Sequence, residues 1–206
     1  MKLLDALRQY RLVAIVRGSD PAATLDAVLT LADCGIALIE VSLTTPDALG
    51  VLTRARRALG PDFGLGAGTV LTVEQAQATA DAGVSYVVTP GLAPSVAEAR
   101  ALGLPALVGA VTPTEVIAAH AAGAEAVKLF PASIGGPEYL RALRDPLPDI
   151  PLVPVGGVDA HRAGEYLRAG AVAVGVGSPL LGDAPHGGDL LQLRARAALM
   201  LAAVTA

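Results

Sequence analysis

The 206-residue sequence has no tryptophan, 3% aromatic residues and a single cysteine, Cys34. One cysteine excludes a disulfide framework and a cysteine-based zinc site. Because Cys34 lies in an apolar helical run, we expect it to be a small buried filler rather than a reactive thiol. Lysine is equally scarce, since only Lys2 and Lys128 among the 15 basic residues are not arginine.

Charged residues of both signs are few, at 17%, whereas 53% of the chain is apolar. This composition excludes a disordered chain and predicts one domain over residues 1–206 with a sizeable core. A net charge of -4 argues against a nucleic-acid partner.

No membrane or export segment is predicted. The longest stretch without charge, residues 82–97, contains two glycines and two prolines, and it is shorter than the ~20 residues that span a bilayer. Asp5 and Arg8 stand where a signal peptide would have its apolar core. We therefore expect a cytoplasmic enzyme or binding protein.

The chain repeats one unit, in which a helix ending in a small residue and glycine precedes a short apolar strand. Eight strands are predicted, at residues 12–17, 37–43, 63–70, 86–90, 105–111, 126–131, 152–158 and 171–177. Continuous apolar runs are typical of parallel strands covered on both faces. Eight units predict a small (β/α)8 TIM barrel with an extra N-terminal helix at 1–10 and a last helix at 190–206. An open doubly wound sheet is the alternative, but it would usually use fewer strands.

Several helix starts carry local signals. Asp20 and Thr45 each precede a proline, which predicts an N-cap followed by proline at the first helical position. Three pairs have the spacing of a capping box, namely Thr72 with Gln75, Ser95 with Glu98, and Thr112 with Glu115.

Lys128 lies inside a predicted strand, on the same face as Ala126 and Phe130. Burial disfavours a charged lysine, and the neutral amine is the form that attacks a carbonyl to make an imine. The alternatives are a lysine that snorkels to the barrel mouth or one that binds phosphate as a point charge. Because arginine supplies almost every other cation and cannot form an imine, the nucleophile is the favoured interpretation.

Glu40 lies in the second predicted strand, on the face of Leu38 and Ser42. A buried carboxylate is costly unless it is paired. We interpret Glu40 as a general acid/base with a raised pKa, with a structural ion pair to Arg17 as the alternative. Because Lys128 is also predicted inside a strand of the same barrel, the acid/base role of Glu40 is favoured over the ion pair.

Three more polar residues end predicted strands, where a barrel places its catalytic groups. The forked guanidinium of Arg17 suits a substrate carboxylate. Thr69 and Thr89 are candidates to donate hydroxyl groups to a carboxylate or carbonyl, although threonine is also an ordinary strand residue.

Two glycine-containing turns follow the last two strands, with Gly156 and Gly157 in one and Gly177 and Ser178 in the other. Barrels frequently bind phosphate with these loops, and glycine lets the backbone approach an anion closely. Plain turns are the alternative interpretation.

The histidines predict no metal site. His120, His161 and His186 do not converge in the sequence, and none ends a predicted strand. We therefore expect neither a metal ion nor another cofactor.

The motifs IEVSLTTP, GAGTVL, VTPG, VKLFPAS, PVGGV and VGVGS occur in that order between about Leu12 and Ser178. This ordered set resembles the family of 2-keto-3-deoxy-6-phosphogluconate and 6-phosphogalactonate aldolases. The resemblance implies a (β/α)8 barrel, a homotrimer and a metal-independent Schiff-base mechanism. It places the imine on Lys128, the acid/base on Glu40 and a pyruvate contact on Thr69. It also places the phosphate on Gly156, Gly157 and Ser178.

One departure points to the phosphogalactonate branch. The phosphogluconate branch typically carries Val-Thr-Leu-Arg-Thr after its glutamate, and that arginine holds the pyruvate carboxylate. Thr44 stands at the arginine position here. The pair Arg17-Gly18 and the run FPASIGGPEYLRAL resemble the other branch, which implies that Arg17 binds the carboxylate.

The substrate implied is a phosphorylated six-carbon keto acid that is cleaved reversibly to pyruvate and glyceraldehyde 3-phosphate. Three alternatives stay open. They are an aldolase of 4-hydroxy-2-oxoglutarate, a phosphosugar-binding barrel with isomerase or synthase chemistry that needs no imine, and a non-catalytic phosphosugar-binding protein.

Overall fold

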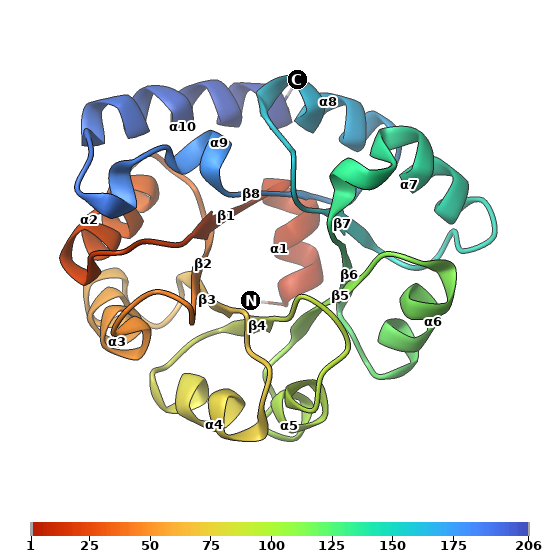
Figure 1. Ribbon diagram of the computed structural model, residues 1–206, viewed down its shortest axis with the longest axis horizontal. Helices are drawn as coiled ribbons and strands as arrows, with labels where there is room; N and C mark the ends of the chain where they lie inside the picture. Colours follow the sequence, from red (N-terminus) through yellow and green to blue (C-terminus); the bar gives the residue numbers. More distant parts are fainter. Residues whose placement is uncertain (1, 206) are drawn as a thin grey trace.

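The computed structural model describes residues 2–205 and confirms the predicted (β/α)8 barrel (Figure 1). Its parallel strands are β1 (Leu12–Val16), β2 (Leu38–Ser42), β3 (Gly64–Gly68), β4 (Tyr86–Val88), β5 (Ala106–Ala110), β6 (Ala126–Leu129), β7 (Leu152–Pro154) and β8 (Val174–Val176). They are hydrogen-bonded in the order β7-β6-β5-β4-β3-β2-β1-β8. A parallel bridge between Val155 and Gly175 joins the two ends of this sheet into a ring.

Helices surround this ring on the outside (Figure 1). They are α2 (Pro21–Asp33), α3 (Ala48–Leu59), α4 (Val73–Asp81), α5 (Ser95–Ala101), α6 (Pro113–Ala121), α7 (Gly136–Arg144), α8 (Ala160–Arg168), α9 (Ser178–Leu181) and α10 (Leu190–Thr205). Short 3-10 turns span Ala132–Ile134 and Ala184–His186. A large apolar core fills the layer between strands and helices, because near-continuous apolar strands face helices on their outer side.

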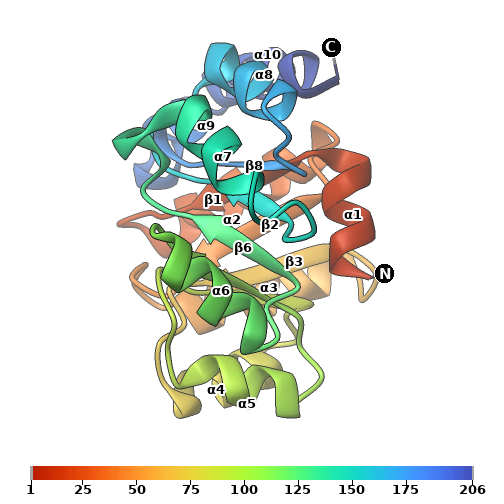
Figure 2. The ribbon, with the colours of Figure 1, turned by 90° about the vertical axis from the view of Figure 1, so that its right-hand side faces the viewer.

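The extra N-terminal helix α1 (Leu3–Tyr10) closes one end of the barrel. Figure 2 shows it across the end from which the strands start. Its buried Leu3, Ala6 and Leu7 belong to the same apolar cluster as inward-facing strand residues such as Val13 and Leu38. The opposite end, where the strands finish, is left for the loops that form a site.

Strand β3 has the sequence GLGAG and leaves room inside the barrel. A Cβ atom on Gly66 would collide with the ring of Tyr86, and one on Gly68 would lie 2.7 Å from Oε1 of Glu40. Glycine on β3 therefore makes space for large polar side chains from the neighbouring strands β2 and β4.

The predicted caps are confirmed at three helices. The Asp20 side chain accepts from the backbone N–H groups of Ala22 and Ala23. Capping boxes form at α4 between Thr72 and Gln75 and at α6 between Thr112 and Glu115.

Two predicted helix caps are wrong. Helix α3 begins at Ala48 with Asp47 as its N-cap, because the Thr45 hydroxyl is buried and accepts from the N–H of Gly18 instead. Ser95 forms no capping box, since its hydroxyl donates to the Val70 carbonyl at 2.7 Å. In both cases a buried tertiary hydrogen bond takes the side chain that the local pattern assigned to a cap.

Smaller differences concern the ends of elements. The observed strands are up to four residues shorter than predicted, because the terminal residues turn into the loops. The predicted terminal helices included Met1 and Ala206, which lie outside the described residues. Cys34 is half-buried at the C-terminal end of α2 and packs against the outer core. Across residues 2–205, no helix combines the length and apolarity needed to cross a bilayer.

Candidate active site

A cavity of about 530 Å³ opens where the strands end. Its walls come from the loops after most of the strands and contain Arg17, Thr69, Lys128, Gly156, Gly157, Gly177, Ser178 and His186 together with apolar side chains such as Ile15, Phe130 and Val155. Six of the seven predicted substrate-binding residues and the predicted nucleophile thus share one cavity.

Lys128 and Glu40 meet inside the barrel below this cavity. The Nζ atom of Lys128 lies 3.9 Å from Oε1 of Glu40, and the two side chains are only 9% and 3% exposed. The same ammonium lies 5.3 Å from the centroid of the Phe130 ring, a cation–π distance. A lysine and a carboxylate from two different strands thus form a buried pair, of which Lys128 lines the cavity and Glu40 does not.

Burial raises the pKa of the Glu40 carboxyl, because its charged form is desolvated. The positive charges of Lys128 and Arg17 act in the opposite direction and offset only part of this effect. A carboxyl whose pKa is raised in this way keeps its proton to higher pH than an ordinary glutamate, which suits a general acid/base.

Arg17 follows β1 and is exposed at the mouth of the cavity. Within residues 2–205, the ion pair of Glu40 is made with Lys128, and Arg17 takes part in none. The ion pair between Arg17 and Glu40 considered above is therefore not formed. The guanidinium of Arg17 is available to an anionic ligand.

Thr69 follows β3 in a left-handed conformation, with φ of 62°. Its hydroxyl lies 3.0 Å from that of Ser42, which is 2.9 Å from the hydroxyl of Thr44. These three hydroxyl groups form a polar chain along the ends of β2 and β3. Thr44 therefore contributes a hydroxyl group, and not the positive charge that an arginine at this position would supply.

Thr89 is placed differently from the other predicted residues. It is fully buried and does not line the cavity. Its hydroxyl accepts from the backbone N–H of Gly109 at 3.3 Å. This contact links β4 to β5 and gives Thr89 a structural hydrogen bond.

The two glycine turns lie side by side at the cavity wall. Gly156 and Gly157 both have left-handed backbones, with φ of 95° and 73°, a conformation that favours glycine. Gly177 and Ser178 start the short helix α9 in the next loop. The turns therefore present main-chain groups rather than charged side chains to the cavity.

His186 lines the same cavity, although the sequence analysis set it aside. Its Nδ1 atom lies 2.8 Å from the Ser19 hydroxyl and accepts from the Ser19 N–H at 3.2 Å. In the neutral ring this leaves the proton on Nε2. The available signal was its place after the eighth strand, since the residues that follow barrel strands, and not the strand ends alone, reach the site.

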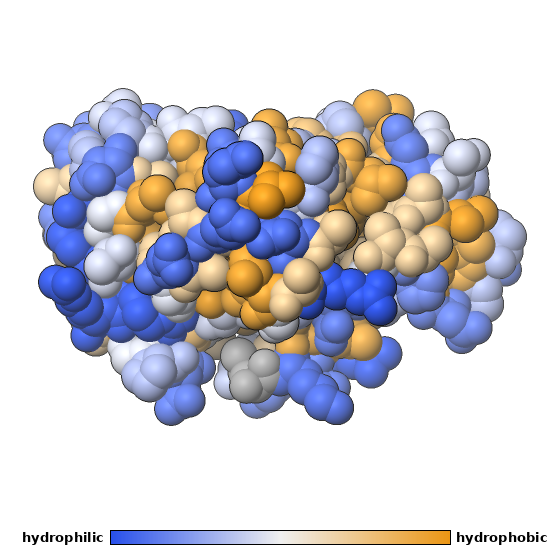
Figure 3. All heavy atoms as spheres, turned by 90° about the horizontal axis from the view of Figure 1, so that it is seen from below, coloured by the Kyte–Doolittle hydropathy of each residue, from blue (hydrophilic) through white to orange (hydrophobic). Residues whose placement is uncertain are grey.

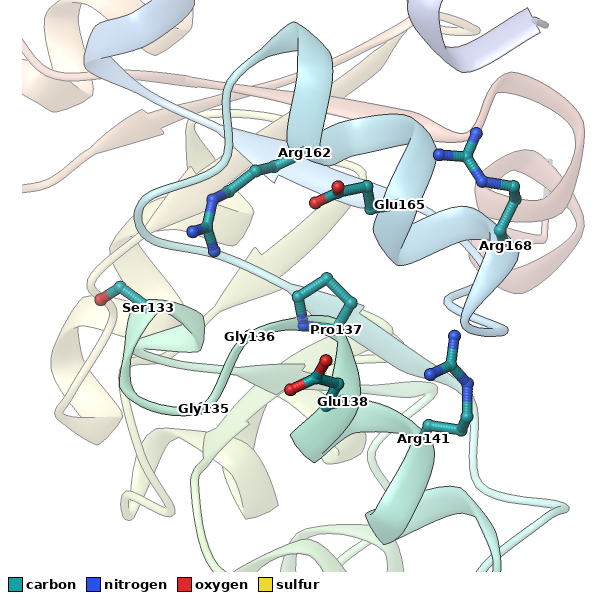
Figure 4. A pocket seen from close by; sticks show the side chains of 9 residues that line it. All are labelled: Ser133, Gly135, Gly136, Pro137, Glu138, Arg141, Arg162, Glu165 and Arg168. Atoms are coloured by element: carbon teal, nitrogen blue, oxygen red, sulfur yellow. The ribbon is translucent and has the colours of Figure 1, made fainter.

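A second hollow, of about 520 Å³, lies outside the barrel between α7 and α8 (Figure 4). Three arginines and two glutamates line it, namely Arg141, Arg162, Arg168, Glu138 and Glu165. Its charges are of both signs and lie on helix surfaces. It receives no residue from a strand, so the strand-end cavity is the candidate active site.

A family model described as "KDPG and KHG aldolase" matches residues 3–191. The chain belongs to this aldolase family. It is 38% identical over 197 residues to a probable 2-dehydro-3-deoxy-6-phosphogalactonate aldolase of Rhizobium meliloti strain 1021, covering 95% of this chain and 92% of that protein. The family assignment made from the ordered motifs is thereby confirmed.

Two solved structures are similar to this chain. One described as a native KDPGal structure superposes with a TM-score of 0.88 at 34% identity and covers 94% of both chains. A designed cube-shaped cage, made by fusing symmetric oligomeric domains, matches with a TM-score of 0.89 at 33% identity. That match covers 96% of this chain and 73% of the cage chain.

Proposed function

We propose that this aldolase reversibly cleaves 2-keto-3-deoxy-6-phosphogalactonate or its gluconate epimer to pyruvate and glyceraldehyde 3-phosphate through an imine on Lys128. The observation that carries the proposal is the buried contact of 3.9 Å between Lys128 and Glu40 at the base of the cavity. Lys128 is the only lysine at the site, since the other lysine, Lys2, lies at the start of the chain.

The reaction begins when the neutral amine of Lys128 attacks the C2 ketone. Glu40 gives a proton to the departing hydroxyl group, so that the carbinolamine loses water and becomes a protonated imine. The C3–C4 bond then breaks, its electron pair moves toward the imine nitrogen, and the C4 hydroxyl proton passes to Glu40. This step releases glyceraldehyde 3-phosphate and leaves an enamine.

Glu40 then returns its proton to C3 of the enamine. Water adds to the resulting protonated imine and gives a proton back to Glu40, and the C–N bond then breaks to release pyruvate and the free amine of Lys128. One carboxyl thus serves as acid and base in turn, which requires a pKa near the working pH. The raised pKa of Glu40 supports this role.

Substrate binding is assigned to the two ends of the cavity. Arg17 and Thr69 hold the carboxylate of the pyruvate half, and the turns at Gly156, Gly157, Gly177 and Ser178 hold the phosphate. All six line the cavity. Phosphate binding far from the breaking bond orients the substrate, so that remote binding energy lowers the barrier.

Arg17 and Thr44 support the phosphogalactonate substrate. An arginine is absent at position 44, and Arg17 is unpaired at the cavity mouth. The Rhizobium relative also has phosphogalactonate in its name. We expect a larger kcat/KM for the galactonate epimer when both epimers are assayed side by side, and a clear preference for the gluconate epimer would contradict this choice.

The aldolase of 4-hydroxy-2-oxoglutarate stays as a second candidate, because the matched family is described as containing both activities. That substrate carries no phosphate group. It would use Lys128, Glu40 and Arg17 in the same way and would leave the glycine turns without a ligand.

The proposal extends to a homotrimer in the cytoplasm. Exposed apolar residues on the side of α4, α5 and α6 support an assembly, namely Leu71, Leu92, Leu102 and Ile117. Figure 3, which views the molecule from this side, shows apolar residues interspersed with hydrophilic ones. The designed cage that this chain resembles was built from symmetric oligomeric domains.

Borohydride reduction in the presence of pyruvate tests the imine. We expect the protein to gain the mass of one reduced pyruvate and peptide mapping to place it on Lys128. Because the chain has only two lysines, Lys2→Arg is a matched control that should still be trapped, whereas Lys128→Arg should not. An active Lys128→Arg variant would favour chemistry without an imine.

A further inference from the structure

The hydroxyl of Tyr86 is exceptional inside the barrel. Tyr86 begins β4 and is 1% exposed. Within residues 2–205, its oxygen is the one buried side-chain polar atom that has no hydrogen-bond partner. Buried hydroxyl groups are nearly always hydrogen-bonded, so this oxygen needs a hydrogen-bond partner other than the protein side chains and backbone.

The sheet register points the Tyr86 ring toward Glu40. Gly66 of β3 pairs with Glu40 on one side and with Tyr86 on the other. The ring atoms of Tyr86 nearest its hydroxyl occupy the space that a side chain on Gly66 would fill. The phenol therefore extends from β4 across β3, in the direction of β2.

Glu40 belongs to β2, and its carboxyl lies beside Gly68, which is the next inward position of β3 after Gly66. Inward positions two residues apart are separated by roughly 6.6 Å along a strand. Two hydrogen bonds of about 2.8 Å through one water molecule join oxygens up to about 5.6 Å apart. The bridge therefore requires the phenol oxygen and the carboxyl to lie closer to each other than the two strand positions do.

We propose that Tyr86 is a positioning residue for Glu40, and that its hydroxyl donates through one buried water molecule to the Glu40 carboxylate. The inference rests on the acid/base role proposed for Glu40. Burial and the charge of Glu40 raise the pKa of the Tyr86 phenol well above its usual range, so the hydroxyl stays protonated and acts as a donor.

The charged groups that face Glu40 come from several elements. Lys128 of β6 and Arg17 after β1 are positive, and Tyr86 of β4 is neutral. Strand β3 presents only glycine and the hydroxyl of Thr69, and α1 presents Leu3, Ala6 and Leu7 to the interior. Tyr86 is thus the neutral donor on the side of Glu40 that lies away from the cavity mouth.

The test is the pH profile of kcat/KM for aldol cleavage. A hydrogen bond to the carboxylate stabilises the ionised form, so Tyr86→Phe should raise the pKa of Glu40. Glu40 must hold a proton in the free enzyme, so its titration sets the basic limb, which should move to higher pH by roughly half a unit to one unit, the size expected for one hydrogen bond. Tyr166→Phe is the matched control, because the Tyr166 hydroxyl is also buried but donates to the Ala132 carbonyl outside the barrel interior.

A basic limb that does not move in folded Tyr86→Phe overturns the proposal, and so does an equal shift in Tyr166→Phe. If Tyr86→Phe does not fold, the near-ultraviolet absorbance decides. The chain has four tyrosines and no tryptophan, so tyrosine dominates this absorbance. Ionisation of Glu40 near Tyr86 should change the tyrosine absorbance of the wild-type protein as pH is varied. The same change should be absent in Glu40→Gln. No such change in the wild-type protein would also overturn the proposal.

The role of Glu40 is tested separately. General acid–base catalysis contributes about 10²- to 10⁴-fold, so Glu40→Gln should lower kcat by a factor in that range. A fully active Glu40→Gln removes the acid/base assignment and the Tyr86 proposal with it. If Glu40→Gln is inactive and the pH profile of Tyr86→Phe does not shift, the acid/base role of Glu40 stands and only the positioning role of Tyr86 is rejected.

Discussion

The side chains of Lys128 and Glu40 are each removed from water while staying next to the other. Desolvation of a lone buried charge is expensive, and a partner charge returns only part of that cost. For Glu40 the balance favours the protonated carboxyl more than in water, although Lys128 lies 3.9 Å away. The pair is therefore suited to proton transfer more than to holding the fold together.

The raised pKa of Glu40 has a consequence for stability. The folded protein keeps a proton on Glu40 at pH values where the unfolded chain, with an ordinary pKa of about 4.3, has released it. This contribution is present in full below the ordinary value and is lost as pH rises through the raised pKa. We expect the Tm of Glu40→Gln minus that of the wild type to increase from about pH 4 to about pH 7. A constant difference in thermal unfolding experiments would show that the carboxyl titrates normally.

Arg17 gives a second residue-level prediction. Removing a charge-assisted hydrogen bond to the substrate carboxylate should raise the KM for pyruvate, in the synthesis direction, by about 10- to 100-fold in Arg17→Ala. The control is Arg54→Ala, which removes an exposed arginine paired with Asp47 on α3, away from the cavity. Equal KM values in the two variants would show that another group binds the carboxylate.

At the scale of elements, the sequence predicted where the secondary structure lies better than where it begins and ends. Apolar strands repeat eight times and six of them follow a helix that ends with glycine, so most local signals agree with the global barrel. The errors at Thr45 and Ser95 arise because their hydroxyl groups bond to Gly18 and Val70, which are distant in sequence. A local pattern contains no information about such partners.

The same limit applies to the site. Alternation within a strand correctly predicted the faces of Lys128 and Glu40, because that periodicity is local. The cavity contains His186 and excludes Thr89, and both facts depend on how loops and neighbouring strands meet. The Tyr86 hydroxyl gave no signal at all, since tyrosine in a strand is ordinary.

At the scale of the whole molecule, the outer ring of helices keeps apolar side chains at its surface. Apolar side chains remain exposed around α4, α5 and α6 (Figure 3). We expect light scattering on the purified protein to give about three times the 20.6 kDa mass of one chain. Introducing a charge at Ile117, which is 52% exposed on α6, should lower that mass if this side forms the contact, and a monomeric mass for the wild type would contradict the trimer.

The glycines of β3 leave the space that two polar side chains of the barrel interior occupy. Gly66 and Gly68 have no side chain, yet the Tyr86 ring and the Glu40 carboxyl occupy the space beside them. A methyl group at either position would displace a polar neighbour while leaving every reactive residue in the chain. A chain of this family could therefore keep its lysine and glutamate, and still lose activity, through exchange of a residue that touches no substrate.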